Sequence, residues 1–182
     1  MALIYLIRHG RAAASFTDDL DPGLDDAGKA QAASASDVLQ AYLPLNLLSS
    51  PLKRAQETAA PLSASTGQNV GIEARVAEIP SPGLSLEERG PWLQKLMAEN
   101  WSEQTAALQA WRADMEACLL GIDTDTAIFS HFVAINVALG LATDSDKALL
   151  FRPDYCSITI LDNTGGKLQL VRRGDEAVTT VN

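Results

Sequence analysis

The chain has 182 residues, of which 47% are hydrophobic and 20% charged, and its 14 Lys and Arg stand against 23 Asp and Glu for a net charge of −9. This length and composition predict one globular domain over residues 1–182. The acidic balance argues against nucleic acid and anionic membranes as partners, because both carry negative charge themselves. No stretch approaches the roughly 20 apolar residues of a membrane-spanning helix.

The N-terminus and the cysteines indicate a cytoplasmic protein. The first apolar run is only six residues long and has no basic leader, which predicts a strand and not a signal peptide. Cys118 and Cys156 fall in an expected helix and an expected strand, and their spacing fits no metal site, so we expect reduced thiols. There is no Gly-rich nucleotide loop and no metal-ligand cluster, so we expect no cofactor and no metal.

The first third of the chain predicts two strands, each followed by a helix. Residues 2–7 are almost continuously apolar, which is typical of a buried strand, and Asp25 is the expected N-cap of the next helix. Residues 46–49 predict the second strand. Ser50 as an N-cap and Pro51 at the first helical position predict where the second helix begins.

The middle of the chain is less regular. Pro61 should kink or interrupt the second helix, and Gly67 should end it. Residues 84–101 show no clean helical period, and Ser102 is the expected N-cap of a later helix. We therefore expect residues 76–101 to form a lid-like insertion.

The last third predicts further buried strands and helices. Residues 126–130 are a short apolar strand, and residues 132–142 are apolar all round, as a helix buried against a sheet would be. Residues 156–161 and 168–171 flank Asn163-Thr164-Gly165-Gly166, which predicts a hairpin. The expected fold is a three-layer α/β/α sandwich with a mostly parallel central sheet.

Both histidines of the chain end strand-like runs. His9 follows the first expected strand together with Arg8, His131 closes residues 126–130, and Arg54 lies just past the second expected strand. Ligands of α/β sheets bind where the carboxyl ends of the strands converge. Two imidazoles and two guanidiniums at three strand ends suit a phosphoryl group, because arginine forms paired, charge-assisted hydrogen bonds with phosphate oxygens.

Four segments, taken in chain order, carry a resemblance to a known family. They are Arg8-His9-Gly10 after a short strand, residues 24–32, residues 49–59 and Ser130-His131. Together they resemble the histidine phosphatase superfamily, which includes the phosphoglycerate mutases. The resemblance reaches from residue 3 to about residue 160 and implies a phosphoglycerate mutase-like fold. It does not indicate the substrate, because function depends on sites carried by a shared fold.

The resemblance implies roles for the residues at the strand ends. His9 would be the nucleophile and His131 a phosphate-binding partner that stabilises charge. Arg8 and Arg54 would clamp the phosphate, and Gly10 would let the backbone approach it closely. A neutral imidazole is a competent nucleophile near pH 7, because its ordinary pKa is about 6.5. The alternative for Arg54 is an ion pair on a helix surface with a nearby glutamate, either Glu57 or Glu88.

Protonation of the leaving group needs an acid, and the family commonly places a carboxyl group in the lid. Glu78 lies about where the resemblance would place that acid, although it lacks the family's usual downstream sequence. It could instead be a solvated carboxylate at a strand end, in which case Asp18 or Asp19 would be the acid. Ser15 stands where many members place an asparagine that touches phosphate, and its hydroxyl could bind phosphate less strongly.

Three departures from the family pattern bear on the pocket. Arg11 stands where an acidic or amide residue is common, and Phe132 follows Ser130-His131 where a glycine is usual. The expected lid also has no paired arginines of the kind with which mutases hold a substrate carboxylate. The sequence therefore favours the phosphatase branch over the mutases.

The leading functional hypothesis is a metal-independent phosphatase that hydrolyses phosphate monoesters through a phosphohistidine on His9. The substrate would be a small-molecule phosphate ester or a phosphoprotein, as in protein phosphohistidine phosphatases. The alternative from another class is a family member that binds phosphorylated ligands without hydrolysing them. The sequence leaves the oligomeric state open.

Overall fold

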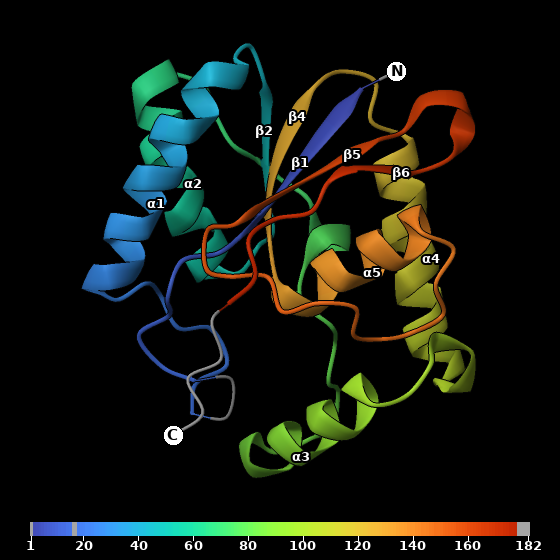
Figure 1. Cartoon of the computed structure of the whole chain (residues 1–182). Helices are drawn as coiled ribbons and strands as arrows, with labels where there is room; N and C mark the ends of the chain where they lie inside the picture. Colours follow the sequence, from blue (N-terminus) through green and yellow to red (C-terminus); the bar gives the residue numbers. More distant parts are fainter. Residues whose placement is uncertain (1, 16–17, 178–182) are drawn as a thin grey trace.

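A six-stranded sheet forms the centre of the molecule (Figure 1). The structure is a computed structural model and describes residues 2–15 and 18–177. The strand order is β3-β2-β4-β1-β5-β6, in which the first four strands are parallel and the last two run antiparallel to β1 and β5 respectively. The strands are β1 Leu3–Arg8, β2 Asn46–Ser49, β3 Gly71–Ile72, β4 Thr126–Ser130, β5 Ile158–Asp162 and β6 Gln169–Arg172. The mostly parallel sheet is confirmed.

Helices cover the sheet on both sides. In Figure 1, α1 and α2 lie on one side of the sheet, and α4 and α5 lie on the other. Helix α3 lies apart from both layers, beyond the ends of the parallel strands. The helices are α1 Asp26–Leu39, α2 Lys53–Thr66, α3 Leu86–Met97, α4 Ala106–Leu120 and α5 Phe132–Ala142, with 3₁₀ turns at Gln40–Tyr42, Ala74–Val76, Trp101–Glu103 and Thr164–Gly166. The expected α/β/α sandwich is confirmed.

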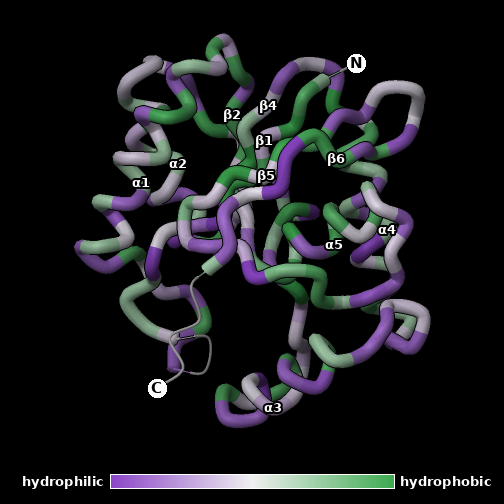
Figure 2. Tube along the Cα trace, viewed as in Figure 1, coloured by the Kyte–Doolittle hydropathy of each residue, from purple (hydrophilic) through white to green (hydrophobic). Residues whose placement is uncertain are grey.

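Each face of the sheet has its own hydrophobic core, because side chains alternate along a strand. In β1, Ile4 and Leu6 pack with the core of the α4 and α5 side, whereas Tyr5 and Ile7 pack with the core of the α1 and α2 side. Hydrophobic residues are concentrated in the strands and in α5 (Figure 2). This burial on both faces explains why the parallel strands are almost continuously apolar in sequence. None of the helices in the described residues is long and apolar enough to cross a membrane.

The register of the parallel strands brings three chain segments together at one end of the sheet. Arg8 is aligned with Ser130, and Ser49 is aligned with Phe129. The His9 amide donates to the Ser130 carbonyl at 3.0 Å, one step beyond the last strand pair. Residues that follow β1, β2 and β4 therefore emerge next to one another.

The second helix begins later than the sequence predicts. Helix α2 starts at Lys53, with Leu52 as its N-cap residue, so the prediction that Ser50 caps this helix was wrong. The Ser50 hydroxyl instead accepts the Leu52 amide at 3.1 Å within the turn that precedes the helix. Pro61 lies inside α2 without ending it, and Gly67 ends it in the left-handed region at φ +70°, as predicted.

Residues 76–101, which were expected to form a lid-like insertion, contain a helix that was not predicted from the sequence. Helix α3 spans residues 86–97 and begins with a capping box between Ser85 and Glu88. Ser102 does not cap α4, because the Thr105 side chain accepts the Leu108 amide and takes that position. The predicted hairpin is confirmed by the antiparallel pairing of β5 with β6, although Cys156 precedes β5 and has a positive φ of 58°.

Candidate active site

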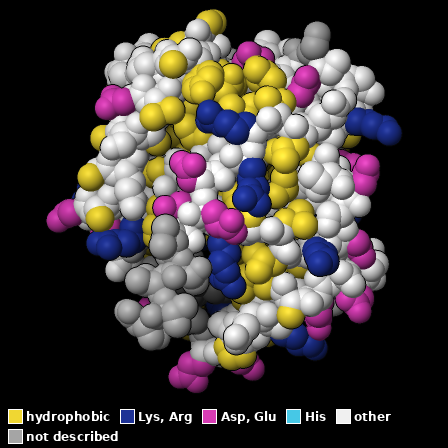
Figure 3. All heavy atoms as spheres, viewed as in Figure 1, with side chains coloured by type: hydrophobic (Ala, Val, Ile, Leu, Met, Phe, Trp, Pro, Cys, Tyr) yellow, Lys and Arg dark blue, Asp and Glu magenta, His cyan; other side chains and the backbone are white. Residues whose placement is uncertain are grey.

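The carboxyl ends of the parallel strands surround a cavity of about 660 Å³. Five of the predicted site residues line it: Arg8, His9, Ser15, Arg54 and Glu78. The other two, Gly10 and His131, are not among the residues that line it. On the face seen in Figure 3, Lys and Arg side chains stand among Asp and Glu side chains. This face is therefore not uniformly acidic, although the chain as a whole has a negative net charge.

The position of the His9 ring is fixed by a backbone contact. Its Nδ1 lies 2.7 Å from the carbonyl oxygen of Gly10, which can only accept a hydrogen bond, so Nδ1 carries the proton. The Nε2 lone pair is left facing Arg54, whose Nε donates to it at 3.2 Å. Burial lowers the pKa of His9 to about 3, and the charges of Arg54 and Arg8 act in the same direction. The ring is therefore neutral at physiological pH, with Nε2 as its basic atom.

The Arg8 guanidinium contacts two aromatic rings. Its guanidinium carbon lies 4.0 Å from the centroid of the Tyr155 ring and 5.2 Å from that of Phe132. One terminal nitrogen donates to the Pro153 carbonyl at 2.8 Å. Phe132, which replaces the family's usual glycine, thus contributes to the contacts of Arg8. Tyr155 was not predicted as a site residue, because it lies in no motif that the chain shares with the family.

Arg54 points into the site and not toward the helix surface. Its side chain is buried, contacts His9, and has Asp21 as its carboxylate neighbour at 4.0 Å. The alternative pairing with Glu57 or Glu88 was wrong. Glu57 accepts the Leu24 amide at 2.6 Å, and Glu88 accepts from Ser85.

His131 lies behind His9 and is completely buried. The two ring centroids are 5.2 Å apart. Its Nε2 lies 2.7 Å from the hydroxyl of Ser50, while its Nδ1 has no hydrogen-bond partner among the described residues. Burial lowers the pKa of His131 well below its usual value, and His9 and both arginines lower it further. Ser50 is thus a site residue that the sequence analysis assigned to a helix cap.

Gly10 has no space for a side chain. A Cβ atom at this position would lie 2.5 Å from the carbonyl oxygen of Gly28 in α1. The Gly10 amide donates to the Thr58 hydroxyl at 3.0 Å, and that hydroxyl donates to the Arg54 carbonyl at 2.7 Å. These contacts tie the His9 loop to α1 and α2. A direct contact between Gly10 and phosphate stays a prediction.

Glu78 lies at the N-terminus of α5. Its carboxylate accepts the backbone amides of Val133 at 3.1 Å and Ala134 at 3.3 Å, as well as its neighbour Ile79 at 3.1 Å. It is therefore not a solvated strand-end carboxylate. Burial raises the pKa of Glu78, although these amides and the charges of Arg54 and Arg8 oppose the increase. A carboxyl group with a raised pKa is suited to donate a proton near neutral pH.

The first loop forms another part of the cavity wall. Ser15 donates its hydroxyl hydrogen to Asp18, and Asp19 accepts the Asp21 amide at 3.1 Å. Asp18 and Asp19 both line the cavity together with Arg11, whose Nε pairs with Asp25 at 2.5 Å. Asp18 and Asp19, the alternatives to Glu78 as the proton donor, therefore line the same cavity as Glu78.

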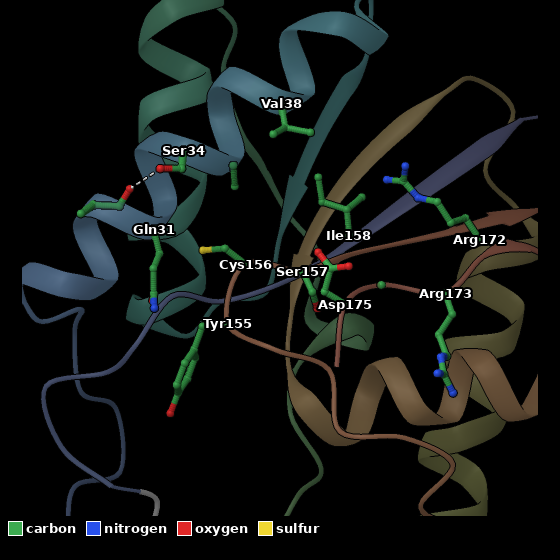
Figure 4. A pocket seen from close by; sticks show the side chains of 13 residues that line it. Gln31, Ser34, Val38, Tyr155, Cys156, Ser157, Ile158, Arg172, Arg173 and Asp175 are labelled. Carbon is green, nitrogen blue, oxygen red and sulfur yellow. Dashed lines mark hydrogen bonds between the residues drawn. The ribbon is translucent and has the colours of Figure 1, made fainter. Parts of the chain in front are cut away.

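A second cavity, of about 600 Å³, lies between α1 and the chain around residues 155–158 and 172–175. Figure 4 shows Gln31 and Ser34 on one side of it, and Ile158 and Arg172 on the other. Neither histidine lines it, so it is not the predicted site. Tyr155 lines both cavities and separates them.

Comparison with known proteins agrees with this geometry. The sequence profile of the histidine phosphatase superfamily (branch 1) matches residues 4–176. The chain belongs to this superfamily. Over 115 residues it is 33% identical to the glucosyl-3-phosphoglycerate phosphatase of Mycolicibacterium vanbaalenii, a match that covers 61% of this chain and 48% of the relative. The Mycobacterium tuberculosis protein of that name is 30% identical over the same length. The chain thus spans about half the length of the curated relatives it matches.

Solved structures share the fold at lower sequence identity. A mycobacterial glucosyl-3-phosphoglycerate phosphatase in complex with VO3 superposes with a TM-score of 0.74 at 21% identity, covering 97% of this chain and 98% of that chain. The phosphoserine phosphatase of Entamoeba histolytica in complex with 3-phosphoglyceric acid gives a TM-score of 0.75 at 20% identity, covering 96% and 98% of the two chains. These likenesses show the fold of this histidine phosphatase superfamily member.

Proposed function

We propose that this protein is a phosphatase that hydrolyses phosphate monoesters without a metal ion, through a phosphohistidine on His9. The observation that carries the proposal is the pair of contacts on the His9 ring. The Gly10 carbonyl holds the proton on Nδ1, and Arg54 donates a hydrogen bond to the unprotonated Nε2 at 3.2 Å. A phosphoryl group bound by Arg54 would therefore lie next to the atom that attacks it.

The reaction takes place in two steps. His9 Nε2 forms a bond with phosphorus while the ester P–O bond breaks, and Glu78 gives a proton to the leaving oxygen. The Glu78 carboxylate then takes a proton from water, which attacks phosphorus and breaks the P–N bond. Inorganic phosphate and free His9 result. Arg8, Arg54 and His131 stabilise the charge on the transferring group, as a metal ion does in other phosphatases.

The size of the cavity supports a small-molecule phosphate ester as the substrate. A volume of about 660 Å³ falls within the usual range of roughly 300–1,000 Å³ for small-molecule sites. The related proteins named above are phosphatases of small phosphate esters, which agrees with this size. A phosphorylated protein side chain is the alternative substrate, and binding without hydrolysis is the alternative function.

Turnover of 4-nitrophenyl phosphate with a chelator present tests the proposal directly. We expect hydrolysis to continue at an unchanged rate, because the positive charge comes from arginine side chains. Loss of activity on chelation that a divalent ion restores would contradict metal independence. Phosphate binding without any turnover would instead support the non-catalytic alternative. A panel of small esters and a phosphohistidine-containing protein then separates the two substrate classes.

A further inference from the structure

The mouth of the catalytic cavity carries a cation that the chemistry described above does not use. Arg152 lines this cavity from the loop between α5 and β5. It immediately precedes Pro153, whose carbonyl accepts a hydrogen bond from Arg8. The Arg152 side chain is therefore attached to the same short segment that positions one arm of the phosphate clamp.

The other three arginines of the cavity already have partners. Arg8 is bonded to Pro153 and stacked on two rings, Arg54 contacts His9, and Arg11 is paired with Asp25. The guanidinium of Arg152, by contrast, makes no ion pair with a carboxylate of the residues that the structure describes. The recorded hydrogen bonds of Arg152 are made by its backbone, whose amide donates to Glu176 at 3.2 Å and whose carbonyl accepts the Ala177 amide at 2.8 Å.

We infer that Arg152 binds a carboxylate on the leaving group of the substrate, an assignment that rests on the proposed phosphatase function. A guanidinium presents a planar pair of donors that matches both oxygens of a carboxylate. Phe132, Leu93 and Met97 contribute only apolar surface to the cavity, so they cannot bind this group. A leaving group with a second phosphate is less well matched, because Asp18 and Asp19 at the same mouth would repel a dianion.

O-phosphoserine and O-phosphoethanolamine form a matched pair of probes, because they differ only in the carboxylate. We expect Arg152→Gln to lower kcat/KM for O-phosphoserine by roughly 10- to 100-fold, the range for a lost charged hydrogen bond. The value for O-phosphoethanolamine should stay within about twofold of the wild type, because the phosphate clamp is untouched. Arg152→Lys should restore part of the loss, because it returns the charge without the paired donors.

Arg172→Gln is the matched control. Arg172 is an exposed arginine that lines the second cavity and not the catalytic one. The substitution Arg172→Gln removes one positive charge, as Arg152→Gln does, so any effect of net charge alone would appear in both variants. Equal losses on the two esters in Arg152→Gln, no loss on either, or the same pattern in Arg172→Gln would overturn the inference.

Binding measurements separate this inference from the proposed reaction. In a His9→Ala background, titration calorimetry with the same two esters reports affinity without turnover. We expect Arg152→Gln to weaken the binding of O-phosphoserine alone. If the wild type hydrolyses neither ester nor 4-nitrophenyl phosphate and this contrast persists, the proposed function fails and the carboxylate site stands. Equal affinities for the two esters before and after the substitution would overturn the carboxylate site.

Discussion

The guanidinium of Arg8 lies 4.0 Å from the centroid of the Tyr155 ring, and the two residues are brought together from opposite ends of the chain. Phe132 lies 5.2 Å from the same guanidinium. An aromatic face attracts a cation and is worth up to about 2 kcal/mol when both groups are shielded from water. We therefore regard Tyr155 as a residue that positions Arg8 for phosphate.

Replacing Tyr155 tests this positioning. We expect Tyr155→Leu to raise KM for an aryl phosphate roughly tenfold with a smaller change in kcat, because the free energy of stacking is lost mainly from binding. Tyr155→Phe retains the ring and should behave as the wild type does. If the Phe variant is as impaired as the Leu variant, the phenolic hydroxyl matters and the stacking does not.

Ser50 should affect catalysis through His131. The substitution His131→Ala removes the imidazole ring itself. We expect it to lower kcat at least about 10²-fold, equivalent to about 2.7 kcal/mol of transition-state stabilisation. Ser50→Ala leaves the His131 ring in place but removes its 2.7 Å contact, so we expect a smaller fall of roughly tenfold. Ser130→Ala is the matched control, since the Ser130 hydroxyl donates to the Val76 carbonyl and not to a histidine. Equal kcat losses in the two serine variants would mean that the effect comes from packing.

Glu78→Gln should act differently on two kinds of substrate. A proton donor matters for an alkoxide, whose conjugate acid has a pKa of about 15, and matters little for a nitrophenolate, which leaves unaided. We expect a large loss of kcat on alkyl phosphates and a much smaller loss on 4-nitrophenyl phosphate. Asp18→Asn and Asp19→Asn, measured on the same esters, test the fallback acids. Equal losses of Glu78→Gln on both esters would show that Glu78 shapes the cavity without donating a proton.

The buried histidines should make stability depend on pH. Burial holds the pKa of His9 at about 3 and that of His131 well below its usual value. Below about pH 6.5 the unfolded chain binds protons that the folded protein does not, so stability is lost as pH falls through this window. We expect the free energy of unfolding to drop by about 1 kcal/mol for each histidine between about pH 7 and about pH 5.5.

Urea unfolding at these two pH values measures the effect. His131→Gln removes one of the two groups, so the drop between the two pH values should be about 1 kcal/mol smaller in the variant, whatever it does to stability at neutral pH. Glu78, whose raised pKa acts in the opposite direction, is present in both proteins, so the difference between them reports on His131. The same slope in the wild type and the variant would mean that the His131 pKa is not lowered by folding.

The strands and helix α5 were predictable because they are buried and their sequences are therefore almost continuously apolar. Helix α3 was not, because only Arg89 and Leu96 are buried along it, so no apolar stripe marks its period. Pro91 inside the helix weakened the helical signal further. The start of α2 was predicted wrongly because Ser50 precedes Pro51, as an N-cap residue often does. Its hydroxyl instead forms a hydrogen bond with His131, which lies 81 positions away in the sequence.

The residues that belong to the family's motifs were predicted as site residues. The residues that hold them in position were not predicted. His9 and Arg54 were each predicted as site residues, and the structure places them in contact. Tyr155 and Thr58 act through contacts with Arg8 and Gly10 that depend on the folded chain. No periodicity or spacing in the sequence encodes such contacts, so they become visible only in three dimensions.

Trapping phosphate on His9 tests the central claim most directly. Protein mixed with a phosphate ester and quenched during turnover should carry one phosphate on His9, stable in base and labile in acid. His9→Ala should carry none and should lack activity, because no other described side chain places an unprotonated imidazole nitrogen against Arg54. Phosphate on another residue, or more than a few per cent of wild-type activity in His9→Ala, would contradict the account.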